Sequence, residues 1–227
     1  MKPTFILGNW KANKTLAEAQ IWVKEFGQKL ISLPENIKLI ICPAFHHLYL
    51  FNLLPAYVAL GVQDLSAFPS GSYTGEISAP MLKGLVKYAL IGHSERRKNF
   101  AESNETIAKK VELALKEEIL PIVCVSQTEE VKSLETLVPQ IKQTGMLLYE
   151  PLFAIGSGLA DSPENANQKA KEFQTIIPQI PILYGGSVTS ENVAGFIKQE
   201  HLAGVGVGGA SLSAETFYNL ILNAQTN

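Results

Sequence analysis

Eight short apolar runs divide the chain, and each is followed by a turn and then by an amphipathic stretch. Runs that are apolar at nearly every position suit strands buried on both faces of a parallel sheet. The pattern therefore predicts eight parallel strands joined by crossover segments. The predicted strands are Thr4–Leu7, Leu39–Cys42, Val58–Val62, Tyr88–Ile91, Pro121–Val125, Met146–Tyr149, Ile182–Tyr184 and Gly204–Val207.

The segments between these runs have the spacing of helices. Leu16–Leu30 and Glu105–Glu118 repeat apolar residues every three or four positions, as an amphipathic helix does. Ser162 followed by Pro163 indicates the start of another helix. Phe45–Leu54 has no clear pattern. Similar spacing predicts further helices over Ala79–Val86, Glu129–Ile141, Ser190–Ile197 and Leu212–Leu222.

Strand–helix alternation places the chain in the α/β class. Eight such units fit a closed, parallel, eight-stranded (β/α)₈ barrel, the TIM barrel, which typically takes ~250 residues. With 227 residues the chain is somewhat shorter, so we expect trimmed helices and loops. The sequence has no low-complexity linker and no shift in composition, which predicts one catalytic domain over residues 1–227. An open doubly wound sheet is the structural alternative, because periodicity alone does not exclude it.

Charge and cysteine content narrow the class of function. A formal net charge of −2, with 18% charged residues, provides no long-range attraction to nucleic acid or to an anionic membrane. Cys42 and Cys124 each lie inside an apolar run, which favours buried free thiols and a reducing compartment. No signal-peptide pattern and no apolar run of membrane-spanning length is present. We expect a soluble cytoplasmic protein.

In barrels of this kind the active site forms from the loops that follow the strands. Gly8-Asn9-Trp10-Lys11 follows the first run. A lone lysine is usually a solvated surface residue. At the barrel mouth, however, the Lys11 ammonium could neutralise a phosphate or a developing oxyanion, and Asn9 could donate a hydrogen bond to the same oxygen.

The fourth run is followed by Gly92-His93-Ser94-Glu95-Arg96-Arg97. A single histidine is more often structural than catalytic, but His93 stands at a strand end with a predicted helix starting behind it. Backbone N–H groups at a helix N-terminus disfavour the imidazolium, so His93 is expected to stay neutral and to donate a hydrogen bond. We expect Glu95 and Arg96 to form a structural ion pair behind the site.

The sixth run is followed by Glu150, Pro151 and an apolar segment that ends in two glycines. A carboxylate at a strand end could simply cap a turn. Proline fixes the backbone directly after it, however, and the segment is too apolar for an ordinary surface loop. A lid that closes over a ligand explains such a segment better. Its glycines can offer backbone N–H groups to an anion.

Paired glycines follow the seventh and eighth runs, in Tyr-Gly-Gly-Ser and Gly-Val-Gly-Gly-Ala-Ser. These loops are the common phosphate site of the barrel fold. Adjacent His46 and His47 cannot face one site on a regular element, so no metal is predicted. The glycine motifs of nucleotide-binding loops are missing, so no cofactor is expected.

Five motifs, taken in order, resemble the triosephosphate isomerase family over nearly the whole chain. They are Gly-Asn-Trp-Lys, Gly-His-Ser-Glu-Arg-Arg, Tyr-Glu-Pro…Ala-Ile-Gly-x-Gly, Tyr-Gly-Gly-Ser-Val and Val-Gly-Gly-Ala-Ser-Leu. Each motif alone is modest evidence, but five in register are specific. The resemblance implies interconversion of dihydroxyacetone phosphate and D-glyceraldehyde 3-phosphate through an enediol(ate), in glycolysis and gluconeogenesis.

The resemblance also implies a role for each matching residue. Glu150 would be the base, His93 the electrophile and proton shuttle, and Lys11 the electrostatic stabiliser. Thr74, in a Thr-Gly-Glu loop, would reach a partner subunit and so implies a homodimer. Glu95 and Cys124 would be structural residues near the site. The implied substrate-binding residues are Asn9, Lys11, Gly156, Ser187, Gly208 and Gly209.

Some positions depart from the family pattern. Phe153 stands where the lid usually has tryptophan, and Leu159 and Asp161 change the far end of the lid, where lysine and alanine are common. Val125-Ser126-Gln127 replaces Ile-Gly-Glu after the fifth run, and Asp64 replaces an asparagine. These departures concern lid kinetics, hinge packing and the dimer interface, because none of them removes a predicted catalytic group.

Two other functions compete with this interpretation. Another phosphosugar barrel enzyme, such as an epimerase or an indole-pathway isomerase, would suit the two glycine loops, but not Lys11, His93 and Glu150 in their motifs. A catalytically inactive barrel kept as a scaffold is the non-enzymatic alternative, and the complete set of three residues argues against it.

Overall fold

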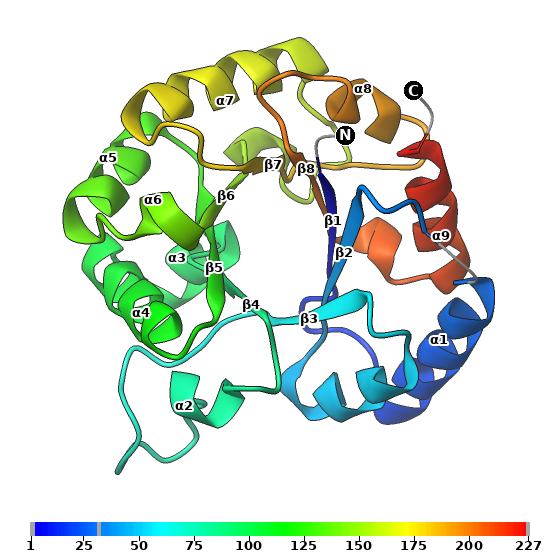
Figure 1. Ribbon diagram of the computed structural model, residues 1–227, viewed down its shortest axis with the longest axis horizontal. Helices are drawn as coiled ribbons and strands as arrows, with labels where there is room; N and C mark the ends of the chain where they lie inside the picture. The colour runs from blue at the N-terminus through cyan, green and yellow to red at the C-terminus, as the bar shows by residue number, and fades with distance from the viewer. Residues whose placement is uncertain (1–2, 31–32, 226–227) are drawn as a thin grey trace.

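The computed structural model describes residues 3–30 and 33–225, and in these residues eight parallel strands close into a barrel. Figure 1 shows the strands in the middle and the helices around them. The closed barrel confirms the predicted fold class. The strands are β1 (Thr4–Asn9), β2 (Ile37–Cys42), β3 (Val58–Val62), β4 (Tyr88–Ile91), β5 (Leu120–Val125), β6 (Met146–Tyr149), β7 (Ile182–Tyr184) and β8 (Gly204–Val207).

Pairing of the first strand with the last one closes the barrel. Strand β1 pairs in parallel with β2 on one side and with β8 on the other, in the register Phe5↔Gly204 to Gly8↔Val207. An open doubly wound sheet would leave two unpaired edges. The alternative of an open sheet is therefore wrong.

The helices form a ring outside the strands, and several begin at a capping residue, among them Ser162, which was predicted. Thr15 and Glu18 form a reciprocal capping box at the start of α1, and Ser162 accepts a hydrogen bond from the N–H of Asn165 at the start of α7. The α-helices are α1 (Leu16–Lys29), α2 (Ala79–Leu82), α3 (Ser94–Phe100), α4 (Asn104–Lys116), α5 (Thr128–Leu137), α6 (Ile141–Thr144), α7 (Pro163–Ile176), α8 (Val193–Ile197) and α9 (Ala214–Asn223).

Two predicted helices end elsewhere in the structure, and one segment without a clear pattern is helical. The segment predicted as Glu129–Ile141 is two helices, α5 and α6, because Pro139 interrupts it. Helix α2 ends at Leu82, before Gly84, which has a φ of 74°. The ambiguous segment at Phe45 is a 3₁₀ helix, η1 (Phe45–Leu53), and shorter 3₁₀ turns form η2 (Leu152–Ala154) and η3 (Gly209–Ser211).

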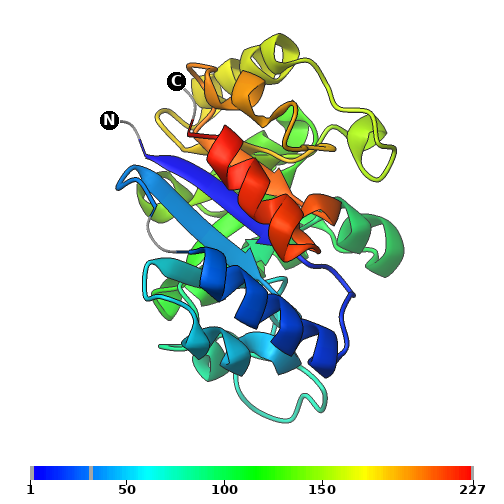
Figure 2. The same ribbon diagram turned by 90° about the vertical axis from the view of Figure 1, so that its right-hand side faces the viewer.

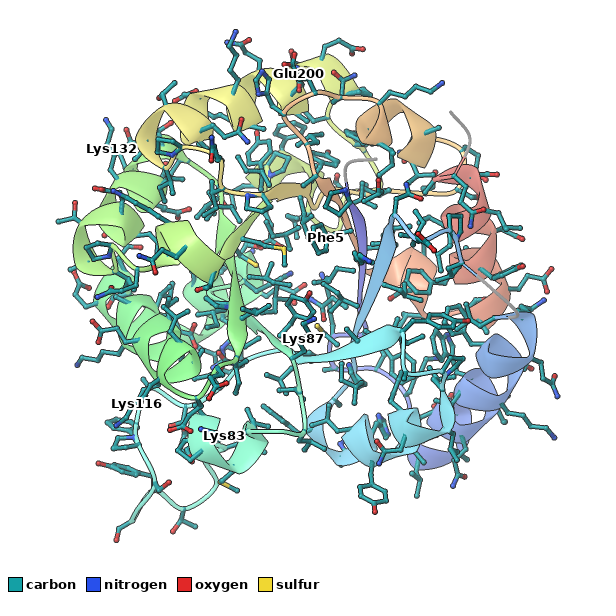
Figure 3. The ribbon with its side chains drawn as sticks, viewed as in Figure 1. Phe5, Lys83, Lys87, Lys116, Lys132 and Glu200 are labelled. Carbon is teal, nitrogen blue, oxygen red and sulfur yellow. The ribbon has the colours of Figure 1, made fainter. Side chains whose placement is uncertain are left out.

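Alternation along the strands separates the inside of the barrel from its outside. Leu7 and Leu90 belong to a cluster of strand residues that fills the barrel, whereas Ile6 and Ile91 pack in a larger cluster with Trp22 and other helix residues. Figure 2 shows α1 and α9 on the outside, and the two helices contact each other. In Figure 3 Phe5 lies near the barrel centre, whereas the exposed residues Lys132 and Glu200 lie on the outer ring.

Both cysteines are buried and free, as the sequence predicted. Burial raises the pKa of the Cys42 thiol to about 12. In residues 3–30 and 33–225 no helix has the length and apolar character needed to span a membrane.

Candidate active site

A cavity of about 300 Å³ lies at the carboxyl ends of the strands. It gathers residues that follow β1, β4, β6, β7 and β8, which are far apart in the sequence, because the C-terminal ends of parallel strands meet at one end of the barrel. All eight residues predicted to bind substrate or to act on it line this cavity: Asn9, Lys11, His93, Glu150, Gly156, Ser187, Gly208 and Gly209.

A larger cavity, of about 1110 Å³, opens elsewhere on the molecule. Residues of β2, β3 and the loop before β4 line it, with Lys38 and Lys87 among them. None of the eight predicted site residues belongs to its lining. The candidate active site is therefore identified by the convergence of polar groups in the smaller cavity and not by cavity volume.

Lys11 has a left-handed backbone conformation, with a φ of 52°. This conformation costs a residue other than glycine roughly 1–2 kcal/mol, so neighbouring groups must hold it in place. The Lys11 N–H donates to Asn9 Oδ1 at 3.0 Å, and Gln63 Nε2 donates to the Lys11 carbonyl at 2.9 Å. The Lys11 ammonium donates to Glu95 Oε1 at 2.5 Å. The lysine is therefore fixed at both its backbone and its charged end.

The predicted ion pair between Glu95 and Arg96 is wrong. Neighbouring residues on a helix point about 100° apart, because there are 3.6 residues per turn. Glu95 turns towards Lys11, whereas Arg96 Nε contacts Glu102 Oε1 at 2.6 Å and Asp64 Oδ2 at 2.8 Å. Glu95 thus faces the site, and Arg96 belongs to a buried ion cluster beside it.

His93 caps the start of helix α3. Its Nδ1 accepts a hydrogen bond from the Glu95 N–H at 3.2 Å, and its Nε2 lies 2.9 Å from Glu150 Oε1. A ring nitrogen that accepts from a backbone N–H carries no proton, which assigns the proton to Nε2. His93 is thus arranged as a neutral imidazole whose Nε2–H faces Glu150 and the cavity.

Glu150 is a buried carboxylate with a close polar contact at each oxygen. Its Oε1 faces His93, and its Oε2 accepts from the Ser94 N–H at 2.9 Å, at the N-terminus of α3. Cys124 lies nearby, and burial together with the Glu150 charge raises the pKa of its thiol well above the usual range. Cys124 therefore stays a neutral thiol beside the carboxylate.

Glycine loops form the opposite wall of the cavity. A Cβ on Gly206 would lie 2.6 Å from Leu148 Cδ1, so the glycine leaves room for this leucine inside the barrel. A Cβ on Gly208 would lie 3.4 Å from Lys11 Cε, which places this loop directly against the lysine. Ser187 donates from its hydroxyl to the Ala154 carbonyl at 2.7 Å and so joins this wall to the loop after β6.

The loop after β6, residues 152–160, is here called the lid. Leu152, Phe153 and Leu159 have 68%, 63% and 70% of their surface exposed. A space of about 650 Å³ lies between the lid and helix α3, lined by Leu152 and Ile155 on one side and by Glu95 on the other. The lid therefore has apolar side chains in solvent and room to move towards the barrel.

Thr74 lies outside this cavity, in the exposed loop between β3 and α2. In the described part of the chain, no group of three or more His, Cys, Asp or Glu side chains is placed to hold a metal ion.

Comparison with known protein families supports the resemblance that the five motifs indicated. The family model described as triosephosphate isomerase matches residues 4–224. The chain belongs to the triosephosphate isomerase family. As a member of this family it is an isomerase, and the resemblance inferred from its five motifs is confirmed.

Curated relatives align with nearly the whole chain. The triosephosphate isomerase of Natranaerobius thermophilus is 40% identical over 97% of this chain and 96% of its own length. Those of Mycoplasmopsis pulmonis and Dictyoglomus turgidum are each 38% identical over 97% of this chain, and 98% and 99% of their own lengths. The shorter chain of this family member therefore retains the full barrel.

Three contacts at the site were not predicted from the sequence. The Ser94 N–H holds Glu150, Gln63 holds the backbone of Lys11, and the hydroxyl of Tyr184 holds the N–H of Asp161 at the end of the lid. The positions of Ser94 and Gln63 at strand ends are the signal that was available. Nothing in the sequence near Tyr184 indicates its partner in the lid.

Proposed function

We propose that this isomerase interconverts dihydroxyacetone phosphate and D-glyceraldehyde 3-phosphate in the 300 Å³ cavity, with Glu150 as the base. The observation that carries the proposal is the convergence of Lys11, His93 and Glu150 on one cavity, with His93 Nε2 only 2.9 Å from Glu150 Oε1. The same glutamate, neutral histidine and closing loop define the mechanism for which this family is known.

The reaction needs a base, because a proton next to a carbonyl is only weakly acidic. Glu150 takes this proton from one carbon and returns it to the adjacent carbon. A well-placed base typically accelerates such a step by ~10²–10⁴-fold. The hydrogen bond from the Ser94 N–H and the close contact with His93 support this role, because they hold the carboxylate in one orientation at the cavity wall.

The reaction also needs stabilisation of the negative charge that develops on oxygen. His93 donates from Nε2 and shuttles protons between the two oxygens of the enediolate, and the Lys11 ammonium stabilises the charge. Loss of one such donor costs on the order of 3–4 kcal/mol in comparable sites. Asn9 and Lys11 line the cavity from the end of β1, and Glu150 lines it from the end of β6.

The substrate phosphate is expected to bind at the glycine loops. Gly156, Ser187, Gly208 and Gly209 line this part of the cavity, and Lys11 lies against Gly208. Backbone N–H groups and a nearby ammonium suit a phosphate dianion. The net charge of −2 makes this local arrangement necessary, since the protein as a whole does not attract anions.

The lid is expected to close over the bound substrate. Its exposed Leu159 and half-buried Ile155 would lose contact with water on closure, and the space beside α3, which Ile155 lines, gives the lid room to move. Closure is expected to remove water from the cavity beside Glu150 and to restrain loss of phosphate from the enediolate.

A homodimer is the proposed assembly. The loop that carries Thr74 projects from the barrel beside α2 (Figure 1). Phe68 and Tyr73 stack in this loop at 4.5 Å with about half of their surface exposed, and Met81 in α2 is 63% exposed. Exposed apolar groups of this kind are typical of protein interfaces. Sedimentation of the 24.8 kDa chain as a stable monomer at micromolar concentration would argue against the dimer.

Residues 1–227 are proposed to form one catalytic domain, since β1 and β8, from the two ends of the described chain, pair with each other. The two free, buried cysteines support a cytoplasmic location.

A coupled assay of triose-phosphate interconversion tests the proposed function. We expect the purified chain to convert both substrates in both directions. Turnover of a different phosphosugar with no triose-phosphate activity would indicate an epimerase-type enzyme. Binding of inorganic phosphate without any turnover would indicate an inactive scaffold.

A further inference from the structure

The two ends of the lid are anchored to the barrel in different ways. At the end near Glu150, the Ala154 carbonyl accepts a hydrogen bond from Ser187 Oγ at 2.7 Å. At the far end, the Asp161 N–H donates to the Tyr184 hydroxyl at 2.7 Å. Burial raises the pKa of Tyr184 to about 12, so this hydroxyl stays protonated at neutral pH. Each end of the lid is thus tied to the loop or strand at β7.

The far end has an additional anchor, which is the carboxylate of Asp161. Asp161 Oδ1 accepts from the Ser162 N–H at 2.8 Å and from Asn165 Nδ2 at 3.2 Å. Both partners lie at the start of helix α7, where the positive end of the helix dipole favours a negative charge. The side chain of Asp161 therefore joins the end of the lid to α7, while its backbone joins it to β7.

Helix α7 does not need Asp161 for its own capping. Ser162 is the N-cap residue, and its Oγ accepts from the Asn165 N–H at 3.1 Å. The structure thus separates two functions in adjacent residues. Ser162 caps the helix, and Asp161 fixes the segment that enters it.

We propose that Asp161 is a positioning residue that fixes the far end of the lid to helix α7 and so confines lid movement to residues 155–160. The proposal rests on the proposed isomerase function and on closure of the lid over the substrate. Each backbone residue that must be ordered on closure costs conformational entropy. A short moving segment between two fixed ends lowers this entropy cost. It also holds the lid in a constant position relative to the glycine loops after β7 and β8.

Early opening of the lid can be detected chemically, because it exposes the enediolate to water before the isomerisation is complete. In that state the carbon–oxygen bond to the phosphate can break, and its electron pair leaves with inorganic phosphate. The electrons of the enediolate oxygen form a carbonyl, and the carbon–carbon double bond moves to the carbon that lost the phosphate. The resulting enol then tautomerises to a 2-oxoaldehyde. Inorganic phosphate released per isomerisation therefore reports on lid closure.

The central variant is Asp161→Ala, which removes both side-chain hydrogen bonds and leaves the backbone N–H for Tyr184. We expect kcat/KM to fall about tenfold, as for the loss of one or two hydrogen bonds that order the far end of the lid before it closes, mainly through a higher KM. Phosphate release per turnover should rise by a similar factor. Asp161→Asn should restore wild-type values, because an amide oxygen can accept the same two hydrogen bonds.

Ser162→Ala is the matched control. It removes the helix cap but keeps the N–H that donates to Asp161, so it should lower the thermal midpoint with wild-type kcat/KM and phosphate release. Asn165→Ala removes one of the two contacts to Asp161 and should give an intermediate effect.

The kinetics of Asp161→Ala and Ser162→Ala test whether Asp161 positions the far end of the lid. Wild-type kcat/KM and phosphate release in Asp161→Ala would overturn the proposal, as would an equal change in Ser162→Ala. In either case normal isomerisation by the wild-type chain would leave the proposed function intact. Failure of the wild-type chain to isomerise triose phosphates would instead refute the function itself.

Discussion

Replacing Glu150 with aspartate keeps the negative charge and withdraws the carboxylate by one methylene group, about 1.5 Å. In the structure, Glu150 Oε1 lies 2.9 Å from His93 Nε2, and Oε2 lies 2.9 Å from the Ser94 N–H. If the backbone stays in place, a withdrawal of this size breaks the hydrogen bond from Ser94 and separates the carboxylate from His93. It also leaves the base too far from the substrate carbon, so Glu150→Asp tests position separately from charge.

The size of the effect follows from this displacement. A misplacement of about 1 Å at a reacting centre can cost ~10²-fold in rate. For a somewhat larger shift we expect kcat to fall by about 10²–10³-fold, which is roughly 3–4 kcal/mol of activation free energy. KM should change by less than about threefold, because Ser187, Gly208 and Gly209 are untouched and phosphate binding is largely independent of the base.

The measurement is a coupled kinetic assay of wild type and Glu150→Asp in both directions, with thermal unfolding as a check on folding. Glu25→Asp is a suitable control, because Glu25 is an exposed glutamate on α1, and it should leave kcat unchanged. A kcat for Glu150→Asp near that of wild type would show that Glu150 is not the base. A large rise in KM with unchanged kcat would assign Glu150 to substrate binding instead.

Three further predictions concern the lysine, the barrel seam and a buried histidine. Lys11→Met keeps the apolar stem and removes the ammonium that lines the cavity, so kcat/KM should fall by about 10²–10³-fold in the coupled assay, and a smaller change than tenfold would count against its role. In Gly204→Ala the added Cβ would lie 1.9 Å from the Phe5 carbonyl oxygen, so urea unfolding should show a loss of at least about 3 kcal/mol, whereas Gly27→Ala within α1 should be neutral or stabilising. Burial, followed by the charges of His46 and Lys14, lowers the pKa of His47 in the folded state, so the unfolded state binds a proton more readily. The contribution of His47 to the free energy of unfolding should therefore be fully present above the unfolded pKa of about 6.5, and it should fall with decreasing pH by up to about 1.4 kcal/mol per pH unit. His47→Phe should flatten this pH dependence in thermal unfolding. An unchanged pH dependence would contradict the lowered pKa of His47.

The barrel could be predicted from the sequence because its strands are short, apolar and bounded by turns. Val58–Val62 and Met146–Tyr149 are strands with the predicted bounds. Helix ends were less predictable. Pro139 splits a segment whose apolar spacing continues across it, and Gly84 ends α2 early by adopting a positive φ. Phe45–Leu53 is a 3₁₀ helix with apolar residues on all sides, so it has no periodicity from which a helix could be predicted.

The cavity residues could be predicted because the C-terminal ends of parallel strands lie at one end of the barrel. A residue that directly follows a predicted strand can therefore be placed at this end from its position in the sequence. The partners of these residues could not be predicted in this way. Glu95 bonds Lys11, 84 positions away, and Asp161 bonds Tyr184, 23 positions away. Such contacts depend on helix rotation and loop path, which neither composition nor spacing determines.

In the proposed mechanism Glu150 removes a proton from the substrate and returns it to the adjacent carbon. The most direct measurement is the NMR detection of deuterium in the product and in the recovered substrate after reaction in D₂O, for wild type and for Glu150→Gln. The glutamine has nearly the same shape and can still accept from the Ser94 N–H, so the protein should remain folded. The proposed mechanism predicts deuterium on carbon with wild type and none above the uncatalysed rate with Glu150→Gln. Deuterium exchange by Glu150→Gln at a rate near that of wild type would contradict it.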